Sequence, residues 1–297
     1  MATAFCPAHI TGFFKAELNK KDSKQLGSLG AGFSIQKGVK TTVTIRNKTK
    51  HDISNFTIKV NGFESGDMKV SEVVLSKFPT KEKFVDVIHE IDVPVGYGFG
   101  CSAAVALSLS IALNDALECK LSKIKVAQIA HDVEIECKTG LGDVLASYHG
   151  GFEIRDKPGA PGIGHVQKIT LDKISIIMIC FSPISTSKFI KEKLSQINGL
   201  GGKMVNELLE SKNYEHFQEM SLEFAKYVNV MTPRMQKVVN QLSKNNIKCG
   251  IALFGETIFS MVPKEKENNV LEILEKFSDG IIIKSKLDDT GARILYN

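Results

Sequence analysis

A glycine-rich segment from Pro94 to Ala104 constrains the fold of this chain more than any other feature. It reads Pro-Val-Gly-Tyr-Gly-Phe-Gly-Cys-Ser-Ala-Ala, so glycine recurs at every second position from 96 to 100. Glycines at this spacing let the backbone turn tightly and approach a ligand, because no Cβ intervenes. The apolar run that follows predicts a buried helix over Ser102–Glu118 whose first amide groups face the turn. Such a helix end binds phosphate.

Two familiar phosphate motifs do not fit this segment. It lacks the Gly-Lys-Ser or Gly-Lys-Thr of a P-loop, and its glycine intervals differ from the dinucleotide-binding fingerprint. A turn that only packs a helix against a strand is the structural alternative.

A second cluster, Lys138-Thr139-Gly140-Leu141-Gly142-Asp143, follows a predicted helix over Ser122–Cys137 that starts with a capping serine. On that helix Glu134 shares a face with two alanines, which would let another element approach its carboxylate. A helix acid and a loop acid supply the magnesium ligand and the base that phosphoryl transfer to an alcohol needs. The alternative is that Glu134 and Glu136 are solvated and Asp143 caps a turn.

Two further clusters carry weaker signals. Cys249–Thr257 predicts a strand, a glycine turn and a second strand. Near the amino terminus, Cys6–Phe14 is followed closely by the glycine-rich run 27–32, and here His9, Thr11 and Ser28 could hydrogen-bond a polyol or a carboxylate. The cation that would bind a substrate carboxylate stays open among Lys15, Lys40, Lys138 and Arg155.

The order of predicted elements indicates a two-domain α+β protein. Strands are predicted first, over 39–46, 55–60 and 84–93, and the two helices follow them. After a strand over 174–181 come helical stretches between 184 and 243, and then strand, strand, helix and strand from 247 onward. Five prolines and glycines between Arg155 and Gly164 predict a loop or a domain crossing there.

Composition narrows the class of protein. The 297 residues are 43% apolar, yet no run approaches the length of a membrane helix and the first residues do not resemble a secretory signal, so a cytoplasmic protein without a membrane segment is expected. The six cysteines are scattered and have no zinc or redox spacing. A net charge of +5 is modest and suits an anionic metabolite as well as a nucleic acid.

Taken in order, the clusters resemble the GHMP kinases, the superfamily of galactokinase, homoserine kinase, mevalonate kinase and phosphomevalonate kinase. The family motif Pro-x-x-x-Gly-Leu-Gly-Ser-Ser-Ala-Ala is kept except that Phe99 replaces leucine and Cys101 replaces the first serine. Within the superfamily the chain is most similar to the archaeal pantoate kinases, on segments 7–14, 27–32, 37–41, 139–144 and 255–259.

This resemblance implies a ribosomal-S5-like amino-terminal domain over residues 1–160, a ferredoxin-like carboxyl-terminal domain over 161–297, and a site between them. It implies ATP and Mg²⁺ as cofactors and pantoate as the small-molecule substrate. Asp143 would be the base, and Ser102 and Glu134 the magnesium ligands, although Glu136 lies close enough to compete for that role. The nucleotide would contact Pro94, Gly96, Gly98, Phe99, Gly100, Cys101, Ser102 and Ala103, and the substrate His9, Thr11, Ser28 and Gly255.

Two other functions stay open. One is a kinase of the same superfamily that acts on another acceptor, such as mevalonate, homoserine or shikimate. The other is a non-catalytic protein that binds a nucleotide or a nucleic acid, although the chain lacks the interleaved aromatic and basic residues typical of single-strand readers. No nucleic-acid partner is expected, and the oligomeric state stays open with a homodimer as one option.

Overall fold

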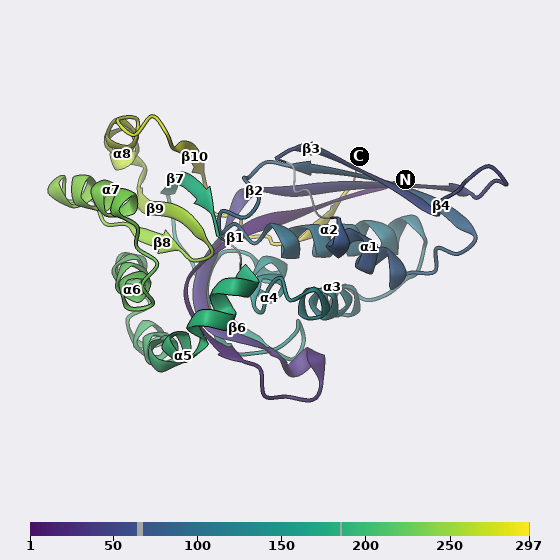
Figure 1. Cartoon of the computed structure of the whole chain (residues 1–297), viewed down its shortest axis with the longest axis horizontal. Coiled ribbons are helices and arrows are strands. Elements are labelled where there is room, and N and C mark those ends of the chain that lie inside the picture. The colour runs from purple at the N-terminus through teal and green to yellow at the C-terminus, as the bar shows by residue number, and fades with distance from the viewer. Residues whose placement is uncertain (64–67, 185, 297) are drawn as a thin grey trace.

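The computed structural model describes residues 1–63, 68–184 and 186–296, and it sets a larger mixed sheet beside a smaller antiparallel one (Figure 1). The larger sheet runs in the order β11-β1-β2-β4-β3, and β5 and β6 extend it from β2. Its strands are β1 (Ala2–Glu17), β2 (Gly27–Asn47), β3 (Phe56–Gly62), β4 (Lys83–Ile91), β5 (Phe152–Lys157), β6 (His165–Ile169) and β11 (Arg293–Leu295).

Strands β1 and β2 form a long hairpin of the larger sheet, and β1 also meets the smaller sheet where the Leu253 amide donates to the Thr11 carbonyl. They pair antiparallel from Ala2 opposite Val43 to Glu17 opposite Gly27, with irregularities in the register after Pro7 and Thr11. Most of β1 is buried on both faces, so its sequence lacks the alternation of apolar and polar residues that predicts a strand. For this reason segment 6–14 could be recognised from the sequence as a motif but not as a strand.

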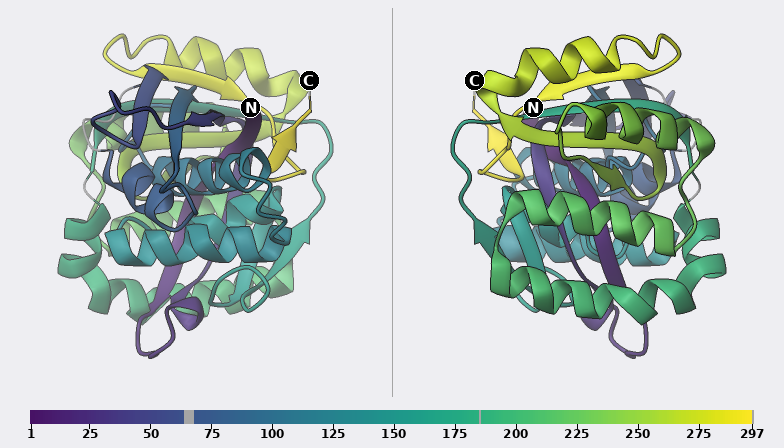
Figure 2. Two further views of the ribbon diagram at one scale, coloured as in Figure 1. Left: turned by 90° about the vertical axis from the view of Figure 1, so that its right-hand side faces the viewer. Right: turned by 90° about the vertical axis from the view of Figure 1, so that its left-hand side faces the viewer.

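Helices α1–α4 cover one face of the larger sheet (Figures 1 and 2). The predicted buried helix is confirmed as α2, in which apolar and small residues on nearly all sides are buried. The predicted capping residue is also confirmed, because the Ser122 hydroxyl accepts a hydrogen bond from the Lys125 amide at the start of α3. The bounds are α1 (Lys69–Ser76), α2 (Cys101–Ala116), α3 (Lys123–Cys137) and α4 (Asp143–His149).

The smaller sheet has the order β10-β7-β9-β8, and each neighbouring pair is antiparallel. Along the chain the order is strand, helices, strand, strand, helix, strand, as the sequence predicted, and this is the ferredoxin-like arrangement that the family resemblance implied. The strands are β7 (Ile174–Pro183), β8 (Gly250–Ala252), β9 (Gly255–Pro263) and β10 (Ile281–Ser285). The helices are α5 (Thr186–Ser211), α6 (Tyr214–Tyr227), α7 (Pro233–Lys244) and α8 (Glu267–Leu274).

An aromatic cluster joins the two sheets. The ring of Phe217 on α6 lies 5.1 Å from that of Phe152, 5.7 Å from Phe259, 5.9 Å from Phe13 and 6.2 Å from Phe33, measured between centroids. These rings come from both sheets and all are buried, so one continuous apolar core fixes the sheets relative to each other.

The loop predicted after Arg155 begins later and serves a different connection. Arg155 lies within β5, and residues 158–164 link β5 to β6 of the same sheet, so the chain passes to the smaller sheet only after β6. The last strand, β11, returns to pair with β1. A division into domains at residue 160 therefore stays a proposal. No helix in the described parts of the chain combines the length and apolar character needed to cross a bilayer.

Candidate active site

The glycine-rich loop connects β4 to α2 and lines a pocket of about 540 Å³. Gly96, Gly98 and Gly100 all have positive φ angles, of 85°, 86° and 57°. Among the described residues no side chain caps the start of α2, so the amides of its first turn are available to an anion. Of the residues predicted to bind the nucleotide, those that line the pocket are Gly96, Gly98, Phe99, Gly100, Cys101 and Ser102.

Two of the predicted nucleotide-binding residues lie behind this surface. Pro94 does not line the pocket, and its carbonyl accepts a weak hydrogen bond from the Cys101 thiol at 3.8 Å. Ala103 is fully buried under the loop. Both therefore support the loop from within the core.

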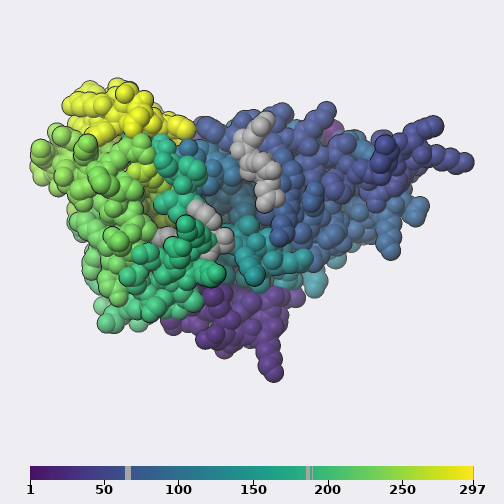
Figure 3. All heavy atoms as spheres, viewed as in Figure 1, coloured from purple at the N-terminus to yellow at the C-terminus, as the bar shows by residue number. Residues whose placement is uncertain are grey.

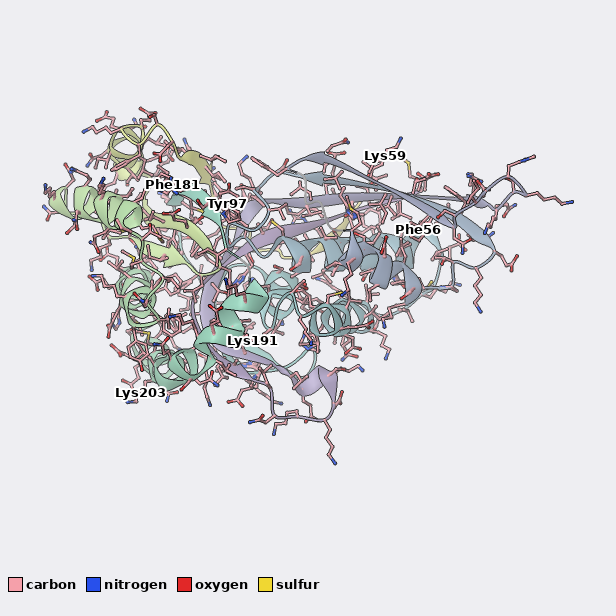
Figure 4. The ribbon with its side chains drawn as sticks, viewed as in Figure 1. Phe56, Lys59, Tyr97, Phe181, Lys191 and Lys203 are labelled. Carbon is pink, nitrogen blue, oxygen red and sulfur yellow. The ribbon has the colours of Figure 1, made fainter. Side chains whose placement is uncertain are left out.

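The turn between β8 and β9 holds the glycine loop in place. A Cβ on Gly98 would lie 2.5 Å from the carbonyl oxygen of Leu253, so the two backbones meet there without room for a side chain. Gly255 packs against the backbone of Tyr97 in the same way, and the Thr257 hydroxyl donates to the Tyr97 carbonyl at 2.8 Å. Figure 4 shows Tyr97 at the junction between the larger sheet and β7, the strand that carries Phe181. Gly255, predicted at the substrate, thus contacts the glycine-rich loop.

Glu134 lies beside the loop with its carboxyl buried. The Thr139 hydroxyl hydrogen-bonds its Oε1 atom, whereas Oε2 has no hydrogen-bond partner among the described residues. Burial, together with the charge of Asp143, raises the pKa of Glu134 to about 7 against the opposing effect of the hydroxyls of Thr139 and Ser102. Glu136 instead lies at the surface and pairs with Lys77 at 2.7 Å. The geometry therefore favours Glu134 of the two candidate acids.

Asp143 faces the same pocket from the first position of α4, with 16% of its side chain exposed. Its Oδ1 atom lies 2.8 Å from Nδ1 of His9 and 3.5 Å from the Thr11 hydroxyl. Burial alone would raise the pKa of Asp143, but the hydrogen bond and charge of His9 and the charge of Arg155 outweigh it and lower the pKa. Asp143 is thus an ionised carboxylate directed at the pocket.

Thr11 and Ser28, which were predicted to contact the substrate, line a small cavity beside the main pocket together with Asp143. The same cavity has apolar walls from Phe14, Leu141, Ile190 and Phe254. His9 is not part of this surface, because its ring is fully buried and both its nitrogens already have carboxylate partners. Glu153, one of these partners, was not recognised in the sequence.

The cations left open by the sequence have different surroundings. Lys15 pairs with Glu17 and Lys40 with Glu90, each at 2.6 Å and away from the pocket, and Arg155 is buried against Glu153. Lys138 lines the main pocket and also a second pocket of about 760 Å³ that reaches α5, where Lys191 lies (Figure 4). Lys69, at the start of α1, also lines the main pocket, and no sequence pattern marked it. In Figure 3 the blue residues around α1 and the green residues of α5 lie on opposite sides of the molecular face that is turned to the viewer.

The fit of a metal ion can be judged from Glu134 and Ser102. Within the described residues, no three His, Cys, Asp or Glu side chains gather as a metal cage. The buried Glu134 carboxyl, which lies near the Ser102 hydroxyl and has one oxygen without a hydrogen-bond partner among the described residues, nevertheless suits Mg²⁺, which usually takes one or two protein oxygens and completes its shell with phosphate and water.

Comparison with known proteins places these features in one family. The family model "GHMP kinases N terminal domain" matches residues 68–151, which include the glycine loop, Glu134 and Asp143. A pantoate kinase from Methanocaldococcus jannaschii is 34% identical over 91% of this chain and 96% of its own length. Among solved structures, a phosphotransferase related to the CoA biosynthesis pathway has a TM-score of 0.88 at 27% identity, covering 98% of this chain and 97% of its own. A homoserine kinase from Cytophaga hutchinsonii has a TM-score of 0.68 at 17% identity over 99% of this chain and 97% of its own, which supports the predicted GHMP kinase fold.

Proposed function

Because the chain belongs to the pantoate kinase family of the GHMP kinases, we propose that it transfers the γ-phosphoryl group of ATP to pantoate and releases ADP and 4-phosphopantoate, a step toward coenzyme A. One observation carries the proposal: the uncapped start of α2 and the carboxylate of Asp143 face the same pocket. Phosphoryl transfer needs such an arrangement, since catalysis consists largely of positioning and charge stabilisation.

The glycine loop and α2 bind the phosphates of ATP. The positive φ angles of Gly96 and Gly98 and the free amides at the start of α2 provide backbone donors, and Lys69 adds positive charge to the same pocket. Oriented backbone donors and cations of this kind stabilise the charge of the transferring group.

Glu134 and Ser102 hold Mg²⁺ in this proposal. The ion supplies charge neutralisation of the β- and γ-phosphates when it is bound. Glu134 is suited to the role because its buried Oε2 atom otherwise has no partner among the described residues. The Ser102 hydroxyl would be the second protein ligand of the ion, and phosphate oxygens of ATP would be further ligands.

Asp143 orients and deprotonates the attacking hydroxyl. The oxygen of the pantoate 4-hydroxyl forms a bond to the γ-phosphorus while the bond from that phosphorus to the bridging β,γ-oxygen breaks, and the hydroxyl proton passes to Asp143. Its lowered pKa keeps Asp143 ionised at neutral pH, so it can accept the hydrogen bond of the hydroxyl before the transfer.

The cavity beside Asp143 matches the acceptor in chemical character. Pantoate combines hydroxyl groups with a carbon that bears two methyl groups, and the cavity combines Thr11 and Ser28 with apolar walls. We accordingly assign substrate contact to Thr11 and Ser28 and not to His9 or Gly255. The cavity holds only about 10 Å³, so the acceptor must displace side chains such as Ile190 or extend into the larger pockets on either side.

Lys138 binds the carboxylate of pantoate in this proposal. It lines both the main pocket and the neighbouring pocket at α5, whereas Lys15 and Lys40 pair with acids away from the pocket and Arg155 is buried against Glu153. Lys138 and Asp143 belong to the same segment, residues 138–143, so Lys138 can bind the carboxylate of the acceptor while Asp143 contacts its reacting hydroxyl.

The test is ADP release with a panel of acceptors and with Asp143→Asn. Pantoate should give the highest kcat/KM, and Asp143→Asn should lower kcat by about 10²-fold or more while ATP still binds. Release of ADP with mevalonate, homoserine or shikimate but not with pantoate would reassign the acceptor within the superfamily. Equal turnover of the variant and the wild type would remove Asp143 from the base role. An affinity for nucleic acid that falls steeply with salt concentration, together with no turnover of any acceptor, would instead indicate a nucleic-acid-binding protein.

A further inference from the structure

Four charged side chains contact one another in a buried row, the charge chain, that starts at the proposed base Asp143. Asp143 contacts Nδ1 of His9 at 2.8 Å, and Nε2 of His9 contacts Glu153, also at 2.8 Å. Glu153 in turn pairs with the guanidinium of Arg155. His9, Glu153 and Arg155 are at most 1% exposed, so the charge chain runs from the pocket directly into the core.

The glycine-rich run of β2 makes room for the charge chain. Gly32 stands opposite Glu153 in the sheet register, and a Cβ there would lie 2.5 Å from Nε2 of His9. Gly30 stands opposite Arg155, and a Cβ there would lie 2.7 Å from its Nη2 atom. In the structure these two glycines therefore accommodate buried side chains.

Alternating charge explains how such groups are tolerated in the core. A buried ion that loses its partner destabilises a protein by several kcal/mol. Here Asp143 and Glu153 flank His9, and Glu153 Oε1 lies between His9 and Arg155, whose Nη1 atom is 3.4 Å from Nε2 of His9. Both carboxylates accept hydrogen bonds, so His9 satisfies both only if both its ring nitrogens carry protons. The resulting imidazolium has no freedom to rotate without breaking one of the two contacts.

We propose that His9 is a positioning residue for phosphoryl transfer, which fixes the carboxylate of Asp143 through Nδ1 and is itself fixed by Glu153 through Nε2. This inference rests on the proposed role of Asp143 as the base. His9 does not line the nucleotide pocket, so its contribution belongs to turnover and not to ATP affinity. An orienting partner of this kind matters because misplacement of a reacting group by about 1 Å costs about 10²-fold in rate.

A matched pair of substitutions separates the two contacts of His9. In His9→Asn the side-chain amide nitrogen replaces Nδ1 and still reaches Asp143, whereas in His9→Gln it replaces Nε2 and reaches only Glu153. We expect His9→Gln to lower kcat about 10²-fold and His9→Asn less than about 10-fold, with the Kd for ATP unchanged in both. Equal losses in the two variants, or a kcat for His9→Gln near that of the wild type, would overturn the proposal.

A double-mutant cycle tests whether His9 acts through Asp143. In an Asp143→Asn background, His9→Gln should cause no further loss of kcat, because the group that it positions is already disabled. A further loss equal to that seen in the wild type would refute the positioning role. Should His9→Gln fail to fold, Glu153→Gln replaces it in the cycle, since it removes the charge that fixes Nε2 and keeps the side-chain volume.

Nitrogen NMR of protein labelled at histidine gives a readout that is independent of activity. In the wild type both ring nitrogens of His9 should carry protons, and Asp143→Asn and Glu153→Gln should each shift the signal of the nitrogen that loses its partner. A His9 ring with one unprotonated nitrogen in the wild type would overturn the proposal, whatever the acceptor. Absence of ADP release with pantoate would overturn the proposed function alone and leave this result standing.

Discussion

Replacing Glu134 by glutamine should stabilise the protein at pH 8 and at the same time weaken the response of its activity to Mg²⁺. Glu134 is 2% exposed, and one of its carboxyl oxygens has no hydrogen-bond partner among the described residues. An ionised carboxylate in such a place destabilises the fold, whereas glutamine is neutral and has nearly the same volume. Glu134→Gln therefore removes the charge without opening a cavity.

The magnitude follows from the pKa of the carboxyl. Burial raises the pKa of Glu134 from 4.5 to about 7, and this difference corresponds to about 3 kcal/mol. Because the pKa is raised in the folded state, the fold keeps its full stability below pH 4.5, where Glu134 is protonated. This contribution to the free energy of unfolding is lost as the pH rises through about 7, where Glu134 ionises. At pH 8 the variant should be more stable than the wild type by up to about 3 kcal/mol, or by about 5 °C in Tm for a chain of this length.

The assay is thermal unfolding at several pH values without nucleotide or metal. The Tm difference between Glu134→Gln and the wild type should be small near pH 4.5, grow as the pH rises from 4.5 to about 7, level off above that, and shrink again when Mg²⁺ and ATP are added. Glu136→Gln is the matched control, because Glu136 is exposed on the same helix, and it should change the Tm little at any pH. A variant no more stable than the wild type at pH 8, or a difference independent of pH, would refute the reasoning.

The remaining predictions concern the loop, the metal and the acceptor. Ser102→Ala should raise the Mg²⁺ concentration for half-maximal rate about 10-fold, and an unchanged Mg²⁺ titration would contradict its role. Lys138→Met keeps the apolar stem and should raise the KM for pantoate about 10-fold with little change in that for ATP, whereas Lys15→Met should change neither. Gly98→Ala should weaken ATP binding in a titration, because it combines a φ of 86° with a contact at 2.5 Å to the Leu253 carbonyl, and equal affinity would contradict the fit of the loop.

Local signals in the sequence predicted the parts of the site that depend on local structure. The glycine loop, the buried helix after it and the Ser122 cap are each specified by residues within one or two turns, so pattern and chemistry agree. Asp143 could be proposed because it follows a glycine turn directly after a helix that carries an acid. The choice between Glu134 and Glu136 required the structure, since only the helix packing shows which of them is buried.

Partners far apart in the chain could not be predicted in this way. His9 and Glu153 are brought together only when β5 pairs with β2, and the contact of Gly98 with Leu253 depends on the smaller sheet. β1 was hidden for another reason, because burial on both faces removes the alternation that marks a strand.

The case of β5 shows what kind of sequence signal would reveal such a site. Its alternation of Phe152, Glu153, Ile154 and Arg155 is typical of a strand with one face in water, and on that basis the two charged residues would be solvated. In the structure both faces are buried, and a glycine stands opposite each charged residue in β2. Glycine opposite charge weakens a solvated sheet and gains nothing there, but it provides space when a long charged side chain must lie flat inside the core. An acid and an arginine alternating on one strand, with a Gly-x-Gly on a candidate partner strand, therefore predict a buried charge chain.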